Sequence, residues 1–320
     1  MNKKKFNYIP VFLCILLIIF FLIRYPSISI EAAKKGLLLW YNSILPSLFP
    51  FMVCTHILVT LNFFKILEKL FSLPMKFLFN LPGNASFIWL TGIISGYPVG
   101  AKLTNDLLEK KEISLNDAQH ILCFANNCGP IFIIGAVGTC LLNDKNIGYS
   151  LLFIHIISSL ILGILLKFIF NKNKSTNTIK KMHKRNSTTQ IDIGSLLSDS
   201  IYDSIEIIIQ IGGYIILFSV ILSIINSLLS TLSINNTLNF FILGMIEMTN
   251  GISLISAYSC PLVLKLSIIS FLLSFSGLSI HAQTASIIKN SNLKLNKYIL
   301  SKFFNGVISF ILSYIYFSII

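Results

Sequence analysis

Two polar breaks interrupt long apolar stretches of the chain, and the first carries paired amides. It covers residues 124–138 and reads FANNCGPIFIIGAVG. Asn126 and Asn127 supply hydrogen-bond donors and acceptors, and Pro130 suits the first turn of a helix that restarts after Gly129. Free N–H groups at a helix start attract anions, so this break predicts a carboxylate site. A packing kink would explain the glycine and the proline but not two adjacent asparagines.

The second break covers residues 274–288 and reads SFSGLSIHAQTASII. Ser279, His281 and Gln283 follow a glycine within this apolar stretch. His281 is a candidate carrier of a coupling proton, and the alternative is a hydrogen-bond bridge between helices. Unpaired polar groups are costly in hydrocarbon, so both breaks are expected to line a protected cavity.

A charged residue stands beside a shorter interrupted segment in each half of the chain. Lys102 ends the text SGYPVGAK, and Glu247 begins EMTNGIS. An ionisable group at membrane depth is a candidate functional residue. Lys102 could pair with an anionic substrate or extend to the lipid headgroups. Glu247 could bind a proton or a sodium ion, or serve as a hydrogen-bonded structural carboxylate.

The composition indicates a polytopic membrane protein. Hydrophobic residues make up 54% of the 320 residues, charged residues make up 12%, and the mean hydropathy is +0.80. The net charge of +13 comes from basic residues between apolar segments, where they fix topology. We therefore expect a lipid bilayer and no nucleic acid as partner.

Neither a metal site nor an enzyme is indicated. The six cysteines lie in or beside apolar segments and form no CxxC pair. The chain has no GxSxG, HExxH, P-loop or dinucleotide-binding motif. We expect no catalytic residue, no cofactor and no metal ion.

The order of segments predicts an all-α fold with two related halves. We expect an N-terminal membrane anchor helix in residues 1–35, a first repeat in 36–171, a basic cytoplasmic linker in 172–190 and a second repeat in 191–320. Each repeat contains a span, a short segment ending in polar glycine-containing text, a broken long segment and an unbroken one. This plan gives about seven full spans plus re-entrant hairpins.

The basic loops predict that the repeats are inverted. Residues 2–5 and 172–185 are lysine-rich and should be cytoplasmic. Both basic segments are on the cytoplasmic side only if residues 85–101 enter the membrane and leave it again on the same face. The two repeats then run in opposite senses, a ground plan of secondary transporters, and the basic stretch 289–302 is also cytoplasmic.

Several motifs resemble one known family. They are ILPSLFPF at 44–51, SGYPVGAK at 95–102, NNCGPIFIIGAVG at 126–138, IGGYIILFSV at 211–220, EMTNGI at 247–252 and SGLSIHAQTAS at 276–286. Together they resemble the YlbJ family of stage V sporulation integral membrane proteins, in the Gate or nucleoside-recognition group. The chain departs from the expected pattern at Cys128, where a serine or alanine is expected.

The resemblance implies a sporulation role in moving dipicolinic acid from the mother cell toward the forespore, with residence in the cell membrane of either. Dipicolinate carries two carboxylates on a pyridine ring, so Lys102 and the asparagine break could hold the acid groups while Tyr97 stacks on the ring. Other sporulation membrane proteins and a second copy of the chain are expected partners.

The sequence thus predicts a secondary-transporter-like protein for a small organic anion. The alternatives are a nucleoside transporter of the Gate type and a membrane scaffold for spore assembly that transports nothing. The expected ion-coupling residues are Glu247 and His281. The expected substrate-binding residues are Tyr97, Lys102, Asn126, Asn127, Gly129, Asn250, Ser279 and Gln283.

Overall fold

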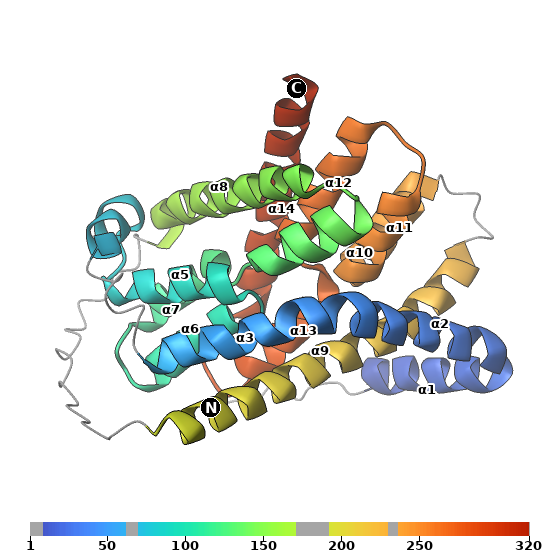
Figure 1. The fold of residues 1–320 in the computed structure, drawn as a ribbon, viewed down its shortest axis with the longest axis horizontal. Helices are drawn as coiled ribbons and strands as arrows, with labels where there is room; N and C mark the ends of the chain where they lie inside the picture. The colour runs from blue at the N-terminus through green and yellow to red at the C-terminus, as the bar shows by residue number, and fades with distance from the viewer. Residues whose placement is uncertain (1–8, 62–69, 171–191, 230–235, 320) are drawn as a thin grey trace.

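The fold is helical throughout the part of the chain that the structure describes. The structure is a computed structural model, and it describes residues 9–61, 70–170, 192–229 and 236–319. Every regular element in those ranges is a helix (Figure 1), which confirms the predicted all-α class. The basic linker 172–190 and residues 2–5, on which the predicted topology rests, lie outside these ranges.

The helices fall into two runs separated by the linker. The first run is α1 (Ile9–Arg24), α2 (Pro26–Leu39), η1 (Trp40–Ile44), α3 (Leu45–Thr60), η2 (Met75–Phe79), α5 (Asn84–Ser95), α6 (Val99–Glu109), α7 (Leu115–Ala125), η3 (Ile131–Leu141) and α8 (Lys145–Phe170). The second is α9 (Ile193–Leu229), α10 (Asn236–Ile246), α11 (Met248–Ala257), α12 (Leu262–Phe275), α13 (Gly277–Ile287) and α14 (Leu295–Ile319). The segments labelled η are π-helical.

Four helices among the described residues are long and apolar enough to cross a membrane. They are Lys145–Phe170, Ile193–Ser227, Leu262–Ile287 and Leu295–Ile319, and the third is interrupted at Ser276. Two bent pairs raise the number to six if each is one span. The expectation of about seven spans is therefore not confirmed.

The N-terminal helices differ in shape from the prediction. The expected first span, α1, folds back at Tyr25, so that residues 15–24 and 26–44 meet at 108°. The wider π-helical turn η1 stands between α2 and α3, and Pro50 lies inside α3. A proline removes a helical N–H donor, but here the helix continues through it.

The first helix of the second half, α9, is the longest of the described helices. It runs without interruption from Ile193 to Leu229. At about 1.5 Å per residue it is longer than the roughly 30 Å of bilayer hydrocarbon, so part of it extends beyond the hydrocarbon. α2 and α3 both pack along it.

The interrupted segment of each half forms a helical hairpin. α5 and α6 are joined through Gly96, Tyr97 and Pro98, and α10 and α11 are joined through Glu247. The arms of each hairpin touch at a pair of glycines. A Cβ atom on Gly92 would lie 3.2 Å from the Cα of Gly100, and one on Gly251 would lie 2.0 Å from the Cα of Gly244. These close approaches explain why both segments need glycine.

We expect Gly251→Ala to lower the free energy of unfolding by about 3 kcal/mol, because the added methyl overpacks a backbone contact. The matched control is Gly213→Ala on α9, where a Cβ meets nothing within 4 Å. Thermal unfolding of the purified protein in detergent measures both. Equal melting temperatures for the two variants would show that the hairpin arms do not pack as described.

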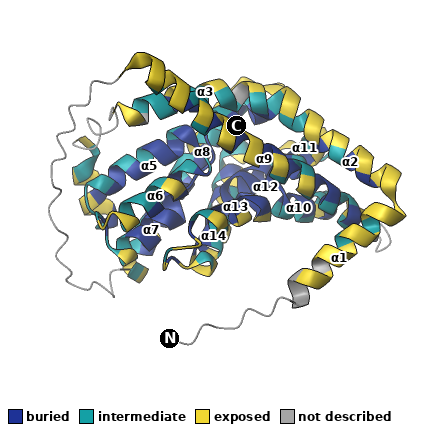
Figure 2. Ribbon diagram, turned by 90° about the horizontal axis from the view of Figure 1, so that it is seen from below, coloured by how far each residue is buried: buried dark blue, intermediate teal, exposed yellow. Residues whose placement is uncertain are grey.

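The core lies between the hairpins. Figure 2 shows buried ribbon in α5, α7 and α12, and exposed ribbon along the outer helices α1 and α2. One buried cluster gathers around η3, α9 and α12, and another around α5, α7 and α8. The broken segments of the two halves meet within this buried region.

Candidate functional site

Four chain breaks converge in the middle of the molecule. The turn at Gly96 packs on the break after α7, where a Cβ atom on Gly96 would lie 2.8 Å from the backbone N of Gly129. The break at Gly277 packs on the start of α11, where a Cβ would lie 3.0 Å from the N of Met248. Gly96 and Gly277 have φ angles of +78° and +74°, which favour glycine.

Tyr97 joins the two halves. Its hydroxyl is hydrogen-bonded to the Oγ of Ser276 and donates to the carbonyl of Leu273 at 3.1 Å. Both partners lie at the C-terminal end of α12. The ring faces the ammonium of Lys302, which lies 5.6 Å from its centroid. The residue predicted to stack on a substrate ring therefore also bridges two breaks.

Asn126 and Asn127 are fully buried and their side chains bind protein groups. The Nδ2 of Asn126 donates to the Tyr298 hydroxyl at 2.8 Å and to Thr284 Oγ1 at 3.2 Å. Its Oδ1 accepts from the N–H of Ala101 at 3.3 Å. The Nδ2 of Asn127 donates to the carbonyl of Phe124 at 2.7 Å. In this conformation both amides hold the break in place.

Lys302 is the main site residue that sequence reasoning missed. The basic stretch 289–302 was expected in the cytoplasm, but the Lys302 side chain is wholly buried in α14. Its Nζ donates to the Asn126 carbonyl at 2.9 Å. The signal in the sequence was its position in the final helical segment, directly before two phenylalanines.

Further buried groups complete a polar network across both halves. The Nε2 of His155 accepts from the N–H of Cys128 at 3.2 Å, and its Nδ1 lies 2.8 Å from Ser274 Oγ. The Nδ2 of Asn305 donates to the Ser274 carbonyl at 3.4 Å. The sequence indicated none of these pairings, because each joins residues far apart in the chain.

Glu247 caps the helix α11. Its carboxylate accepts from the N–H of Thr249 at 3.1 Å and from the N–H of Asn250 at 2.7 Å. The Asn250 side chain donates to the same carboxylate at 3.0 Å and to Ser219 Oγ at 2.8 Å. Glu247 is buried, and no described basic residue forms an ion pair with it. A carboxylate thus already occupies the anion-binding start of this helix.

The polar residues of α13 are buried but only partly paired. The Nε2 of His281 donates to the carbonyl of Phe275 at 2.9 Å, and its Nδ1 has no hydrogen-bond partner among the described residues. The Oγ of Ser279 also has none. Gln283 is buried on the same helix. These groups have capacity for further hydrogen bonds.

Lys102 lies apart from the asparagines. Its side chain is exposed on α6, and it lines a pocket of about 200 Å³ together with His56 and Asp106. The breaks instead line a second cavity of about 50 Å³, together with Tyr97, Gly129 and Thr249 among others. The structure therefore separates Lys102 from the predicted partners at the first break.

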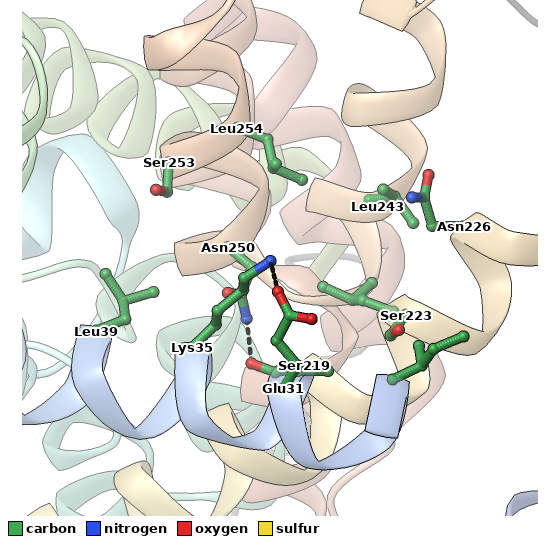
Figure 3. Close-up of a pocket in the computed structure, with 13 residues that line it drawn as sticks. Glu31, Lys35, Leu39, Ser219, Ser223, Asn226, Leu243, Asn250, Ser253 and Leu254 are labelled. Atoms are coloured by element: carbon green, nitrogen blue, oxygen red, sulfur yellow. Dashed lines mark hydrogen bonds and ion pairs between the residues drawn. The ribbon is translucent and has the colours of Figure 1, made fainter. Parts of the chain in front are cut away.

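A third pocket, of about 400 Å³, lies against α2, α9, α10 and α11. Figure 3 shows its side chains, with Lys35 paired to Glu31 at 2.8 Å and Asn250 bonded to Ser219. Asn250 lines this pocket and is hydrogen-bonded to Glu247, so the pocket extends to the N-terminal cap of α11. Its volume falls in the range of about 300–1,000 Å³ that is usual for ligand sites.

The three spaces follow one another along α9. Ile207 lines the Lys102 pocket, Ile211 and Ile215 line the central cavity, and Ser219 lines the pocket of Figure 3, which extends to Asn226. From Ile207 to Asn226 the helix rises by roughly 28 Å. Two larger pockets are thus separated by a small cavity at the four breaks.

No group of three or more His, Cys, Asp or Glu side chains in the described ranges could hold a metal ion. What the arrangement offers instead is backbone and amide polarity at helix ends, together with one buried ammonium and one buried carboxylate. Such groups bind and orient small ions.

A search of known proteins finds one informative relative. The sporulation integral membrane protein YlbJ of Bacillus subtilis (strain 168) is 29% identical over an alignment of 338 positions, which covers 96% of this chain and 82% of the relative. This chain is similar to YlbJ over nearly its whole length. The resemblance to YlbJ seen in the motifs is thereby confirmed.

The likeness to YlbJ and the apolar spans agree on location. The relative is an integral membrane protein by name, and this chain has several helices long and apolar enough to span a bilayer. The chain is therefore an integral membrane protein. No protein-family model matches it, and no solved structure matches it.

Proposed function

We propose that this protein is a secondary transporter of sporulating cells that moves a small organic anion, dipicolinate, across the cell membrane of the mother cell or the forespore. The observation that carries the proposal is the row of spaces along α9, with a small cavity at four helix breaks between two larger pockets. Interrupted helices around a central site are the usual construction of such transporters. The printed name of the relative, a sporulation protein, supports the cellular setting.

The proposal includes two inverted repeats, in residues 36–171 and 191–320, after an anchor in 1–35. It is supported by the matching order of parts in the two halves: a hairpin, a broken helix and an unbroken helix. The glycine contact within each hairpin is also repeated. In this scheme each hairpin re-enters the membrane, and the linker 172–190 is cytoplasmic.

The proposed roles of the site residues follow from their places. Asn250, Ser279 and Gln283 bind the substrate, while Tyr97, Asn126, Asn127 and Gly129 form the wall that separates the two pockets. Lys102 attracts the anion into the pocket of about 200 Å³ that it lines. Glu247 couples transport to a proton, because its three N–H contacts suit a carboxylate rather than the oxygen shell of a metal ion. His281 takes part in the same proton transfer.

The central cavity of about 50 Å³ is too small for a ring with two carboxylates, so the structure corresponds to a closed state of the proposed cycle. Movement of the hairpins relative to α9 would open the cavity to one pocket at a time. The buried polar groups take up hydrogen bonds with one another in the closed state, which avoids leaving them unpaired.

The test is uptake of radiolabelled dipicolinate into proteoliposomes that contain the purified full chain. We expect saturable uptake that unlabelled dipicolinate inhibits and uridine does not. Uptake of uridine in preference to dipicolinate would favour the nucleoside transporter of the Gate type. Absence of uptake of either compound would favour the membrane scaffold and remove transport as the function.

A pair of tryptophan variants tests the path along α9. Ile215 is buried beside the central cavity, and Leu217 is 50% exposed on another face of the same helix. We expect Ile215→Trp to reduce uptake at least about tenfold, because a tryptophan fills the cavity through which the substrate passes. Leu217→Trp should leave uptake unchanged. Equal uptake by both variants would place the path elsewhere.

A further inference from the structure

The buried ammonium of Lys302 has oxygen ligands but no anionic partner. Its Nζ donates to the Asn126 carbonyl at 2.9 Å and to Asn127 Oδ1 at 3.4 Å. The Tyr97 ring provides a third, aromatic contact at 5.6 Å, within the usual range of about 6 Å for a cation and a ring. Among the described residues the acidic side chains in ion pairs are Glu31 and Asp203, and neither pairs with Lys302.

The oxygens around this ammonium belong to the end of a broken helix. α7 ends at Ala125, and the carbonyl groups of a last helical turn have no partner within the helix. The carbonyl of Phe124 accepts from Asn127 Nδ2 and from Ser159 Oγ. The carbonyl of Asn126 accepts from Lys302. A helix C-terminus carries partial negative charge, which favours a cation at this point.

The matching break in the second half is satisfied without a cation. At the end of α12 the carbonyl of Leu273 accepts from Tyr97 and that of Ser274 accepts from Asn305. The carbonyl of Phe275 accepts from His281. Three uncharged side chains therefore satisfy the free carbonyl groups at the end of α12. At the end of α7 a buried ammonium has this role. Burying a charge costs far more than burying a neutral donor, so packing of the break alone does not require Lys302.

We propose that the end of α7 is a binding site for a monovalent metal cation of the sodium type, and that the ammonium of Lys302 occupies it in place of the metal ion. The ligands are neutral carbonyl and amide oxygens, which suit a single positive charge. Divalent cations are usually bound with carboxylates. Asn305 lies one turn after Lys302 on α14, and its buried Oδ1 has no hydrogen-bond partner among the described residues. Its amide nitrogen is bound to the Ser274 carbonyl at the other break, so the ligands shown at the end of α7 are the oxygens of Asn126 and Asn127.

This inference goes beyond transport and does not depend on it. It predicts that the wild-type protein needs no metal ion at this break, and that removal of the lysine creates a site that does. The stability of the purified full chain in detergent reports on the site directly, so that failure of the uptake experiment leaves this test intact.

The experiment compares Lys302→Ala with the wild type in solutions of choline, sodium and n-propylammonium chloride at equal ionic strength. Propylammonium replaces the atoms that the substitution removes. We expect Lys302→Ala to melt several degrees below the wild type in choline and to regain at least half of that loss in saturating sodium, and likewise in saturating propylammonium. The wild type should melt at the same temperature in all three salts.

Two further variants keep the test decisive. Lys297→Ala is the matched control, since Lys297 is exposed on the same helix and contacts the Phe170 ring at 5.2 Å. It should show no recovery specific to sodium or propylammonium. Lys302→Met retains an unbranched side chain of similar length without the charge, and it should be destabilised in every salt.

The outcomes separate the possibilities. Recovery with propylammonium alone would overturn the metal-ion site, because it would only refill a cavity. A Lys302→Met protein as stable as the wild type would also overturn the proposal, since the charge would then be unnecessary. If Lys302→Ala cannot be purified from cells, recovery of its folded yield on membrane solubilisation in sodium supports the site, and failure in every salt overturns it.

Discussion

Replacing Asn126 by alanine is expected to lower the free energy of unfolding by about 3–5 kcal/mol, because the side chain is buried and joins three helices. Its Oδ1 accepts from Ala101 N–H at the start of α6, and its Nδ2 donates to Thr284 on α13 and Tyr298 on α14. Alanine leaves the Ala101 N–H without a partner. An unsatisfied buried donor alone costs about 1–3 kcal/mol.

The measurement is the melting temperature of the purified protein in detergent, with a fall of roughly 5–15 °C expected for a loss of this size. Asn146→Ala is the matched control, because Asn146 is exposed in the first turn of α8. It should change stability by less than about 0.5 kcal/mol. Tyr298→Phe removes one partner of Asn126 and should have an intermediate effect.

The pair of variants also shows whether Asn126 acts through Tyr298. Residues in one hydrogen-bond network are not additive, so the double variant Asn126→Ala, Tyr298→Phe should be more stable than the sum of the single effects predicts by about 0.5 kcal/mol or more. If Asn126→Ala has the same melting temperature as the Asn146→Ala control, the Asn126 amide does not hold the break in place and is free to bind a ligand.

The positions of the breaks could be predicted from the sequence because their causes are local. Glycine and proline within apolar text at Gly96, Gly129 and Gly277 interrupt the helices where the structure has them. The hairpin at Glu247 was indicated in the same way. The sharp turn at Tyr25 was not predicted, although Pro26 follows it, because an apolar run before a proline also suits a straight span.

The contacts between the breaks could not be predicted, because their partners are far apart in the chain. Lys302 binds a carbonyl 176 residues away, and Tyr97 binds a hydroxyl 179 residues away. A lysine near the end of an apolar stretch also has two physical outcomes, since it can extend to the headgroups or be buried with oxygen ligands. Lys102 is exposed and Lys302 is buried.

We expect Glu247→Gln to reduce proton-driven accumulation of dipicolinate by about tenfold or more, while exchange of dipicolinate across the membrane persists. The two N–H groups of Thr249 and Asn250 are accepted by different oxygens of Glu247, so glutamine, with one oxygen, keeps only part of the cap of α11. It cannot take up and release a proton. The variant thus removes the proton-binding group while part of the helix cap remains.

Two controls define the measurement. Glu206→Gln removes an exposed carboxylate from α9 and should leave accumulation unchanged. Glu247→Ala removes the cap as well as the charge, so it should lower both accumulation and the melting temperature, the latter by an amount that corresponds to about 1 kcal/mol for a lost helix cap.

The chemical likeness between Glu247 and the substrate gives this prediction its second part. A carboxylate of dipicolinate has the same acceptor atoms as Glu247, and the start of α11 can hold only one of them at a time. In the proposed transport cycle, protonation of Glu247 would weaken its hydrogen bonds to the backbone and free the site for the substrate, which would couple proton binding to anion binding. Accumulation by Glu247→Gln at the wild-type level would exclude this exchange and leave Glu247 as a structural cap.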